Sequence, residues 1–116
     1  MKCIQVKAVG GPENMELVDV PTPVPGPKQA LVKLAASGVN FIDVYFRTGL
    51  YKADFPIALG NEGAGTVEAV GPGVTEVAPG DRVAYAMARG SYAEYAVGPA
   101  WQLRSEEHTS ELQSLV

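Results

Sequence analysis

The sequence predicts a mainly β fold, a small and partly open barrel with one or two short helices. Three observations favour it. Several short runs alternate apolar and polar residues, thirteen Gly and nine Pro interrupt these runs, and one segment alone has helical spacing. At 116 residues the chain has the size of a single domain. We therefore expect one compact domain around one core.

The first three strands are predicted from residues 1–37. MKCIQVKAV alternates as a strand, GGPEN is typical of a turn, and MELVDVP alternates again, so the chain is expected to open with a hairpin-like pair. The segment PTPVPGPK cannot be a central strand, because Pro has no backbone N–H to donate. It is predicted to be an extended connection to the next strand, QALVKLAAS.

A short helix is predicted to begin after Asn40 and to end at Gly49. Four residues recur at helical spacing in this segment, namely Phe41, Val44, Tyr45 and Thr48. The Asn40 side chain is of the type that caps a helix. Asp43 suits the first turn of a helix, and it precedes Arg47 by four residues, the spacing of a helix ion pair. Capping alone could explain Asn40.

The second half continues with strands and turns. GNEGAGTVEAVGPGV, residues 60–74, combines closely spaced Gly with a β-prone run. It is followed by the turn VAPGD and by the strands RVAYAM and GSYAEYAVGPA. GNEGAG precedes a strand and does not open a helix, so it is not predicted to be a phosphate-binding loop.

Composition excludes several classes of function. The net charge is −4 and no run of Lys or Arg could neutralise phosphates, so nucleic acid is not an expected partner. Neither a signal segment nor an apolar stretch long enough to cross a bilayer is found, so we expect a cytoplasmic protein with no membrane partner. Cys3 is the one cysteine, and it is interpreted as a small strand residue instead of a nucleophile.

The composition changes after Leu103. The run RSEEHTSELQS resembles the in-frame translation of a common sequencing adaptor. We therefore expect a native domain at residues 1–103 and a non-native tail at 104–116. A genuine polar terminus is the alternative. The tail contains the single His of the chain, so the native part is expected to have none.

Four motifs together resemble the medium-chain dehydrogenase/reductase superfamily. They are GVNFIDVYFRTGLY, GNEGAG, VGPGVTEVAPGDRV and GSYAEYAV. Within the superfamily, residues 1–103 resemble the N-terminal catalytic domain of zinc-independent NADPH:quinone oxidoreductases of the zeta-crystallin type. The resemblance implies a GroES-like barrel, which agrees with the strand pattern. It also implies a fragment that stops before its dinucleotide-binding half.

The resemblance suggests a second interpretation of Asn40. Zinc-dependent relatives have Cys where this chain has Asn40, and His where it has Asn61. A catalytic zinc needs three protein ligands drawn from Cys, His and carboxylates. Glu62 alone would be a poor site, so no metal is expected.

The resemblance also implies roles for six residues. Asn40, Tyr45 and Tyr51 are expected at the catalytic site, with Asn40, Phe41 and Tyr51 beside the NADPH cofactor. Asn61 and Glu62 are expected to border the former metal position. Structural alternatives remain open, since Tyr45 and Phe41 could belong to a buried helix face and Tyr51 could close a turn.

The function implied by the resemblance is transfer of reducing equivalents from NADPH to a quinone or enone without zinc. The fragment alone is expected to be inactive, and the intact protein is expected to be a homodimer through its missing half. A free-standing GroES-like interaction module is the alternative from another class, with YKADFPIAL as its loop. An enoyl-type reductase is the further enzyme alternative.

Overall fold

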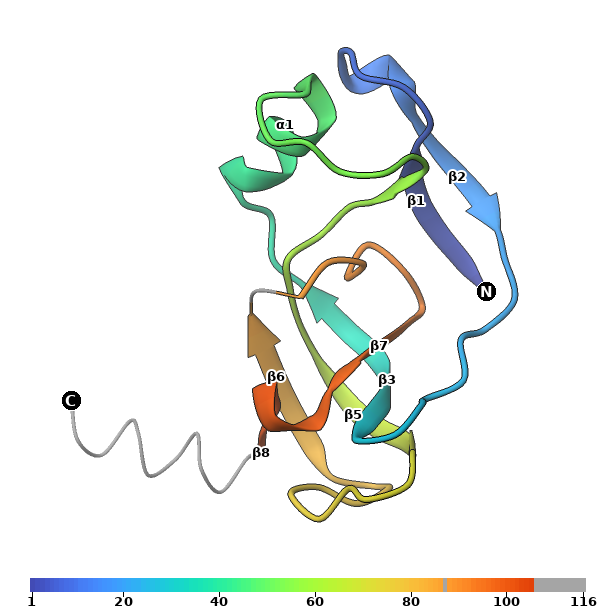
Figure 1. Ribbon diagram of the computed structural model, residues 1–116, viewed down its shortest axis with the longest axis vertical. Coiled ribbons are helices and arrows are strands. Elements are labelled where there is room, and N and C mark those ends of the chain that lie inside the picture. Colours follow the sequence, from blue (N-terminus) through green and yellow to red (C-terminus); the bar gives the residue numbers. More distant parts are fainter. Residues whose placement is uncertain (87, 106–116) are drawn as a thin grey trace, which may run out of the picture.

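The structure is a computed structural model that describes residues 1–86 and 88–105 (Figure 1). Within these residues one α-helix accompanies short strands. The elements in chain order are β1 Lys2–Val6, β2 Met15–Asp19, β3 Gln29–Ser37, α1 Phe41–Thr48, β4 Ile57–Ala58, β5 Glu62–Val70, β6 Arg82–Ala86, β7 Tyr95–Pro99 and β8 Arg104–Ser105. Short 3₁₀ turns lie at Pro12–Asn14 and Ala100–Gln102.

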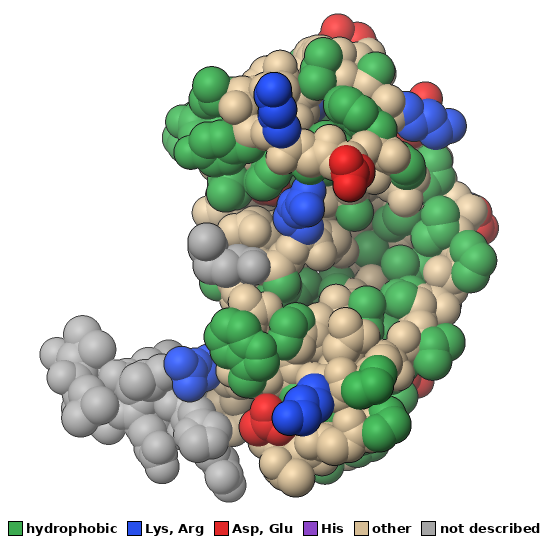
Figure 2. All heavy atoms as spheres, viewed as in Figure 1, with side chains coloured by type: hydrophobic (Ala, Val, Ile, Leu, Met, Phe, Trp, Pro, Cys, Tyr) green, Lys and Arg blue, Asp and Glu red, His purple; other side chains and the backbone are tan. Residues whose placement is uncertain are grey.

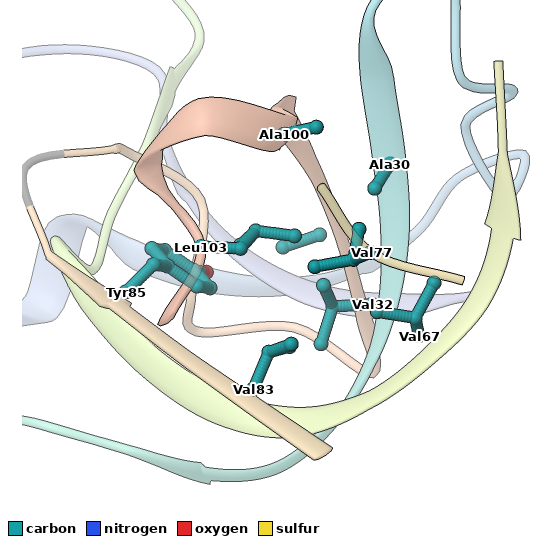
Figure 3. Packing of buried hydrophobic residues seen from close by; sticks show 9 residues of the cluster. Ala30, Val32, Val67, Val77, Val83, Tyr85, Ala100 and Leu103 are labelled. Carbon is teal, nitrogen blue, oxygen red and sulfur yellow. The ribbon is translucent and has the colours of Figure 1, made fainter. Parts of the chain in front are cut away.

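The larger sheet forms the barrel part of the molecule. Its five strands are antiparallel neighbours in the order β7-β3-β5-β6-β8. Buried side chains from these strands and the adjoining loops point toward one another in Figure 3. The labelled members of this cluster are Ala30, Val32, Val67, Val77, Val83, Tyr85, Ala100 and Leu103. Alternation along each strand directs one face inward, which explains why the predicted strands bury these positions.

A smaller sheet lies beside the barrel and carries the helix end of the molecule (Figure 1). Its order is β2-β1-β4, and Lys2 pairs with Asp19 in the antiparallel β1–β2 register. A second core cluster of Val6, Ile57 and Leu59 lies at this end, with Phe46 of α1 packed against it. The helix is therefore fixed by the small sheet.

The predicted fold class is confirmed. The described residues form a mainly β, GroES-like arrangement of two sheets in a partly open barrel, and the hairpin-like start and the helix lie where they were expected. Cys3 is a buried strand residue, as predicted. No helix of this part of the chain has the length and apolar character needed to cross a lipid bilayer.

Two short strands were not predicted. β4 lies within YKADFPIAL, which was interpreted as a loop, and pairs with β1. β8 begins the expected tail and pairs with β6. Strands of two residues are too short to show alternation, so only tertiary pairing reveals them. Residues 106–116, the rest of that tail, lie outside the described residues.

The helix does not bury the side chains that its spacing indicates. Phe41 is 79% exposed, and Val44 and Tyr45 are 37% exposed. The buried position is Asp43, only 6% exposed. The alternative that Phe41 and Tyr45 belong to a buried helix face is therefore wrong. On the inner face of the helix, the Asp43 carboxylate accepts a hydrogen bond from the backbone N–H of Gly60, which an apolar side chain could not do.

Candidate active site

The start of α1 holds Asn40. Asn40 is the N-cap, with extended backbone angles of φ −132° and ψ 154°, and its carbonyl accepts from the Asp43 N–H at 3.1 Å. The Asp43 carboxylate accepts from the Asn40 N–H at 3.3 Å. The Asn40 side chain faces the Asp43 amide as in a capping box without reaching hydrogen-bond geometry. The cap is present, and the half-buried Asn40 amide retains capacity for another partner.

Asp43 joins three segments of the chain. One carboxylate oxygen accepts from the Gly60 N–H at 3.0 Å, and the other accepts from the Tyr92 hydroxyl at 2.8 Å. Buried carboxylates are stable only when such donors replace water. Asp43 was not predicted to have this role, because its donors lie 17 and 49 residues away.

The predicted ion pair between Asp43 and Arg47 is wrong. Within the described ranges no ion pair links them, and Arg47 donates instead to the Gly10 carbonyl at 2.7 Å. Both side chains meet distant backbone groups that the fold brings close. Such partly buried bonds are worth more than an exposed helix ion pair.

Tyr92 completes the contacts of Asp43. Burial, together with the hydrogen bond to the Asp43 carboxylate and the charge of that carboxylate, raises the pKa of Tyr92 to about 12. The hydroxyl therefore stays protonated and donating across the neutral range. Tyr92 was predicted to lie in a strand and to have no role in the site, whereas it lies in the loop before β7. A tyrosine in an alternating run carries no local signal for such a bond.

Asn61 and Glu62 lie beside the segment that precedes Asn40. The Glu62 carbonyl accepts from the Gly38 N–H at 3.1 Å. A Cβ on Gly38 would collide with the Glu62 carboxylate, so this carboxylate lies directly against the backbone two residues before Asn40. Asn61 is half-buried, and its carbonyl accepts from the Ala88 N–H at 3.3 Å. The fold thus brings these two residues to the helix start.

The two predicted tyrosines form a pair at the other end of α1. Their ring centroids are 5.5 Å apart in an edge-on arrangement, and the Tyr51 N–H donates to the Tyr45 carbonyl at 3.2 Å. The ring centroids of Phe46 and Tyr51 are 5.8 Å apart, with Phe46 on the inner side. The Arg89 guanidinium lies 4.9 Å from the Phe46 ring centre. The Tyr45–Tyr51 pair is thereby held while both rings stay partly exposed.

The surface around this pair exposes several apolar side chains, and the charged Lys52 and Asp54 lie among them. Figure 2 shows hydrophobic side chains gathered over the α1 end of the molecule. An open hollow of about 410 Å³ lies beside Tyr51, with Phe46 and Phe55 among its lining residues. A flat apolar molecule could rest on this surface.

The predicted site residues form two groups along α1. Asn40 lies with Asn61 and Glu62 at the helix start, and Tyr45 lies with Tyr51 at its end. Within the described residues no hydrogen bond or ring contact joins Asn40 to either tyrosine. Phe41 faces outward one turn before Tyr45.

The donor set near Asn40 consists of the amides of Asn40 and Asn61 and the carboxylate of Glu62. Zinc is bound in proteins chiefly by Cys and His, with carboxylates as further ligands. Across residues 1–86 and 88–105, no group of three His, Cys, Asp or Glu side chains is close enough to hold a metal ion.

Comparison with known families decides the classification. Residues 26–105 match the alcohol dehydrogenase GroES-like domain. The chain belongs to this family. The match ends two residues after the predicted boundary at Leu103 and includes β8.

The chain is also similar to proteins named as quinone oxidoreductases. The chain is 52% identical over 98 residues to a quinone oxidoreductase of Pseudomonas aeruginosa, covering 83% of this chain and 30% of that protein. A solved quinone oxidoreductase of Pseudomonas syringae pv. tomato superposes with a TM-score of 0.87 at 50% identity, over 90% of this chain and 33% of that one. The quinone oxidoreductase of Escherichia coli, solved with NADPH, gives 0.88 at 37% identity over the same shares.

These similarities confirm the predicted resemblance to quinone oxidoreductases, which are oxidoreductase enzymes. The GroES-like chain described here spans about a third of the length of these relatives.

Proposed function

We propose that this chain forms the acceptor side of the active site in an NADPH-dependent quinone oxidoreductase that works without zinc. The observation that carries the proposal is the exposed Tyr45–Tyr51 pair, in which Tyr45 belongs to the short helix capped by Asn40 and Tyr51 lies three residues after the end of that helix. Similarity to proteins named as quinone oxidoreductases, one of them solved with NADPH, supports it.

The residues present fit the flat ring of a nicotinamide. Phe41 exposes most of its ring, Asn40 has an amide without a strict hydrogen bond, and Tyr51 offers a hydroxyl beside an aromatic face. When bound, NADPH supplies the reducing equivalents. Asn40, Phe41 and Tyr51 would hold the ring end of the cofactor, while its phosphates need residues that this chain does not offer.

The chain's own residues act by positioning the acceptor. Tyr45 and Tyr51 provide an apolar wall against which a quinone ring can lie, and the Tyr51 hydroxyl can donate to a carbonyl oxygen. The Asn40 amide can donate to the same kind of oxygen. Asn61 and Glu62 keep the helix start polar. No metal is required for any of these contacts.

An unsaturated ketone would be held by the same contacts, so an enoyl-type reductase is the competing assignment. Competition between a quinone and an enone for the intact enzyme separates the two. A free-standing interaction module receives no support from the described residues, because part of its proposed loop is β4 and is paired with β1. For the longer protein we propose a homodimer.

The test is binding of 1,4-naphthoquinone to the 116-residue chain, followed by amide NMR. We expect shifts at Asn40, Tyr45 and Tyr51 and none at Val83 in the barrel core. Asn40→Asp keeps a good helix cap but removes the amide donor, so binding should weaken about three-fold or more at unchanged stability.

Tyr51→Phe keeps the ring and removes only the hydroxyl, and it should weaken binding to a similar degree. Tyr95→Phe in β7 is the matched control and should bind like the wild type. Equal binding by Asn40→Asp and the wild type would leave Asn40 with a capping role alone. Quinone reduction by the isolated chain with NADPH, well above background, would contradict the proposed inactivity of the fragment.

A further inference from the structure

Asp43 is the one charged side chain among the described residues that is buried. Its carboxylate does not point to the exposed face of α1 but accepts three hydrogen bonds, from the backbone N–H groups of Asn40 and Gly60 and from the Tyr92 hydroxyl. These donors come from the helix start, from the turn before β5 and from the loop before β7. A single side chain thus joins three separate segments.

The segments joined by Asp43 fit closely around Gly60. The Gly60 carbonyl accepts from the Gly90 N–H at 2.9 Å, and the Leu59 carbonyl accepts from the Tyr92 N–H at 3.1 Å. A Cβ on Gly60 would collide with the Ser91 hydroxyl and lie 2.6 Å from the Tyr92 nitrogen. The turn therefore has little freedom to move while Asp43 holds it.

The residues assigned to the acceptor site lie at the ends of these same segments. Asn40 directly precedes α1, and Asn61 and Glu62 directly follow Gly60. A shift of the helix start relative to this turn would change the separation between the Asn40 amide and the Asn61–Glu62 pair. Small displacements of such groups reduce binding and catalysis strongly.

Only a carboxylate satisfies all three donors. An amide of the same shape has one accepting oxygen and one NH₂ group, so the NH₂ must face either the Gly60 N–H or the Asn40 N–H. Two donors facing each other in a buried place repel and leave a backbone group unsatisfied. The substitution Asp43→Asn therefore keeps the shape of the side chain but places an N–H donor opposite another donor.

We propose that Asp43, held by Tyr92, is a positioning residue that fixes Asn40 relative to Asn61 and Glu62 in the acceptor site. Asp43 touches neither acceptor nor cofactor and acts through the backbone of Asn40 and Gly60. The link to acceptor binding rests on the proposed function, whereas the geometric part does not.

The test uses the 116-residue chain and three variants. Asp43→Asn removes the three-way acceptor, and Tyr92→Phe removes one of its donors. Asp81→Asn makes the same chemical change at the turn where Asp81 accepts from the Ala78 N–H at 2.9 Å. Residual dipolar couplings report the orientation of α1 relative to β5, and 1,4-naphthoquinone titration reports the affinity of the site.

We expect altered α1 couplings and about a five-fold or greater loss of naphthoquinone affinity in Asp43→Asn, about two-fold in Tyr92→Phe, and neither in Asp81→Asn. Unchanged couplings and affinity in a folded Asp43→Asn chain would overturn the proposal. If Asp43→Asn does not fold, the couplings of Tyr92→Phe decide in the same way.

Failure of the proposed function has a separate signature. If wild-type chain does not bind naphthoquinone at Asn40, Tyr45 or Tyr51, the acceptor-site assignment fails. The couplings then still decide whether Asp43 fixes the helix start.

Discussion

Tyr85 and Tyr92 differ in whether the side-chain hydroxyl has a hydrogen-bond partner, and this difference decides what each hydroxyl contributes to stability. Tyr85 is 8% exposed in the barrel core, and within the described residues its hydroxyl has no hydrogen-bond partner. Burial raises its pKa to about 12. The pKa of Tyr92 is raised to a similar value, but its hydroxyl donates to Asp43. Removing each hydroxyl should therefore have opposite consequences.

We expect Tyr85→Phe to leave the free energy of unfolding unchanged or to raise it by up to about 1 kcal/mol, because an unsatisfied polar group is removed. Tyr92→Phe should lower it by about 1–2 kcal/mol, because the Asp43 carboxylate loses a donor. Urea unfolding measures both. A clear loss of stability in Tyr85→Phe would mean that its hydroxyl binds a buried water.

At the scale of elements, α1 was predicted with its correct bounds, and the alternative of a buried apolar face, which the spacing left open, is contradicted by the exposure of Phe41 and Tyr45. The cap at Asn40 and the stop at Gly49 are local signals, and both are present. The direction of the helix is set by Asp43, two of whose three donors, the Gly60 N–H and the Tyr92 hydroxyl, lie on other segments. The outward apolar stripe is consequently available for the proposed site.

Substitution by Ala can be compared at Gly60 and at Gly80, two turn positions with the same backbone angle φ. Both have φ +96°, where a side chain is strained, but a Cβ on Gly80 would meet nothing within 4 Å. We expect Gly80→Ala to lower the free energy of unfolding by about 1–2 kcal/mol. Gly60→Ala should lower it by about 4 kcal/mol or more, because the backbone of Tyr92 must also move.

Urea unfolding of the two Gly variants provides the measurement. Equal losses in both would contradict the close packing of the Gly60 turn against the loop before β7. Such packing has no sequence signature, since GNEGAG is equally compatible with an open turn.

At the scale of the whole molecule, the two sheets are joined by few but specific contacts. An isolated bridge pairs Cys3 with Ala93, and the Ile4 N–H donates to the Tyr92 carbonyl at 2.8 Å. The barrel core extends to Leu103, which is buried. The described structure thus uses the chain up to β8.

We propose that the native domain ends at Leu103 and that residues 104–116 are foreign to it. The free energy of unfolding of a chain of residues 1–105 should lie within about 0.5 kcal/mol of that of the full chain. The free energy of unfolding of a chain of residues 1–102 should be lower by about 2 kcal/mol or more, because the buried Leu103 side chain is missing from the barrel core. Urea unfolding and amide spectra measure both.

A large loss in the 1–105 chain would argue that residues 106–116 contribute to the fold, against the adaptor interpretation. Sequencing the source DNA outward from the GSYAEYAV codons tests that interpretation directly.

The sequence by itself determined the strands with clear alternation, the Pro-rich connection, the helix cap and the family resemblance, because these depend on neighbours within a few residues. Tertiary structure alone decided which face of α1 is buried, the two-residue strands β4 and β8, and the contacts of Asp43. The physical reason is that the Gly60 and Tyr92 donors are remote in sequence. A buried carboxylate selects its partners only after the sheets have brought them together.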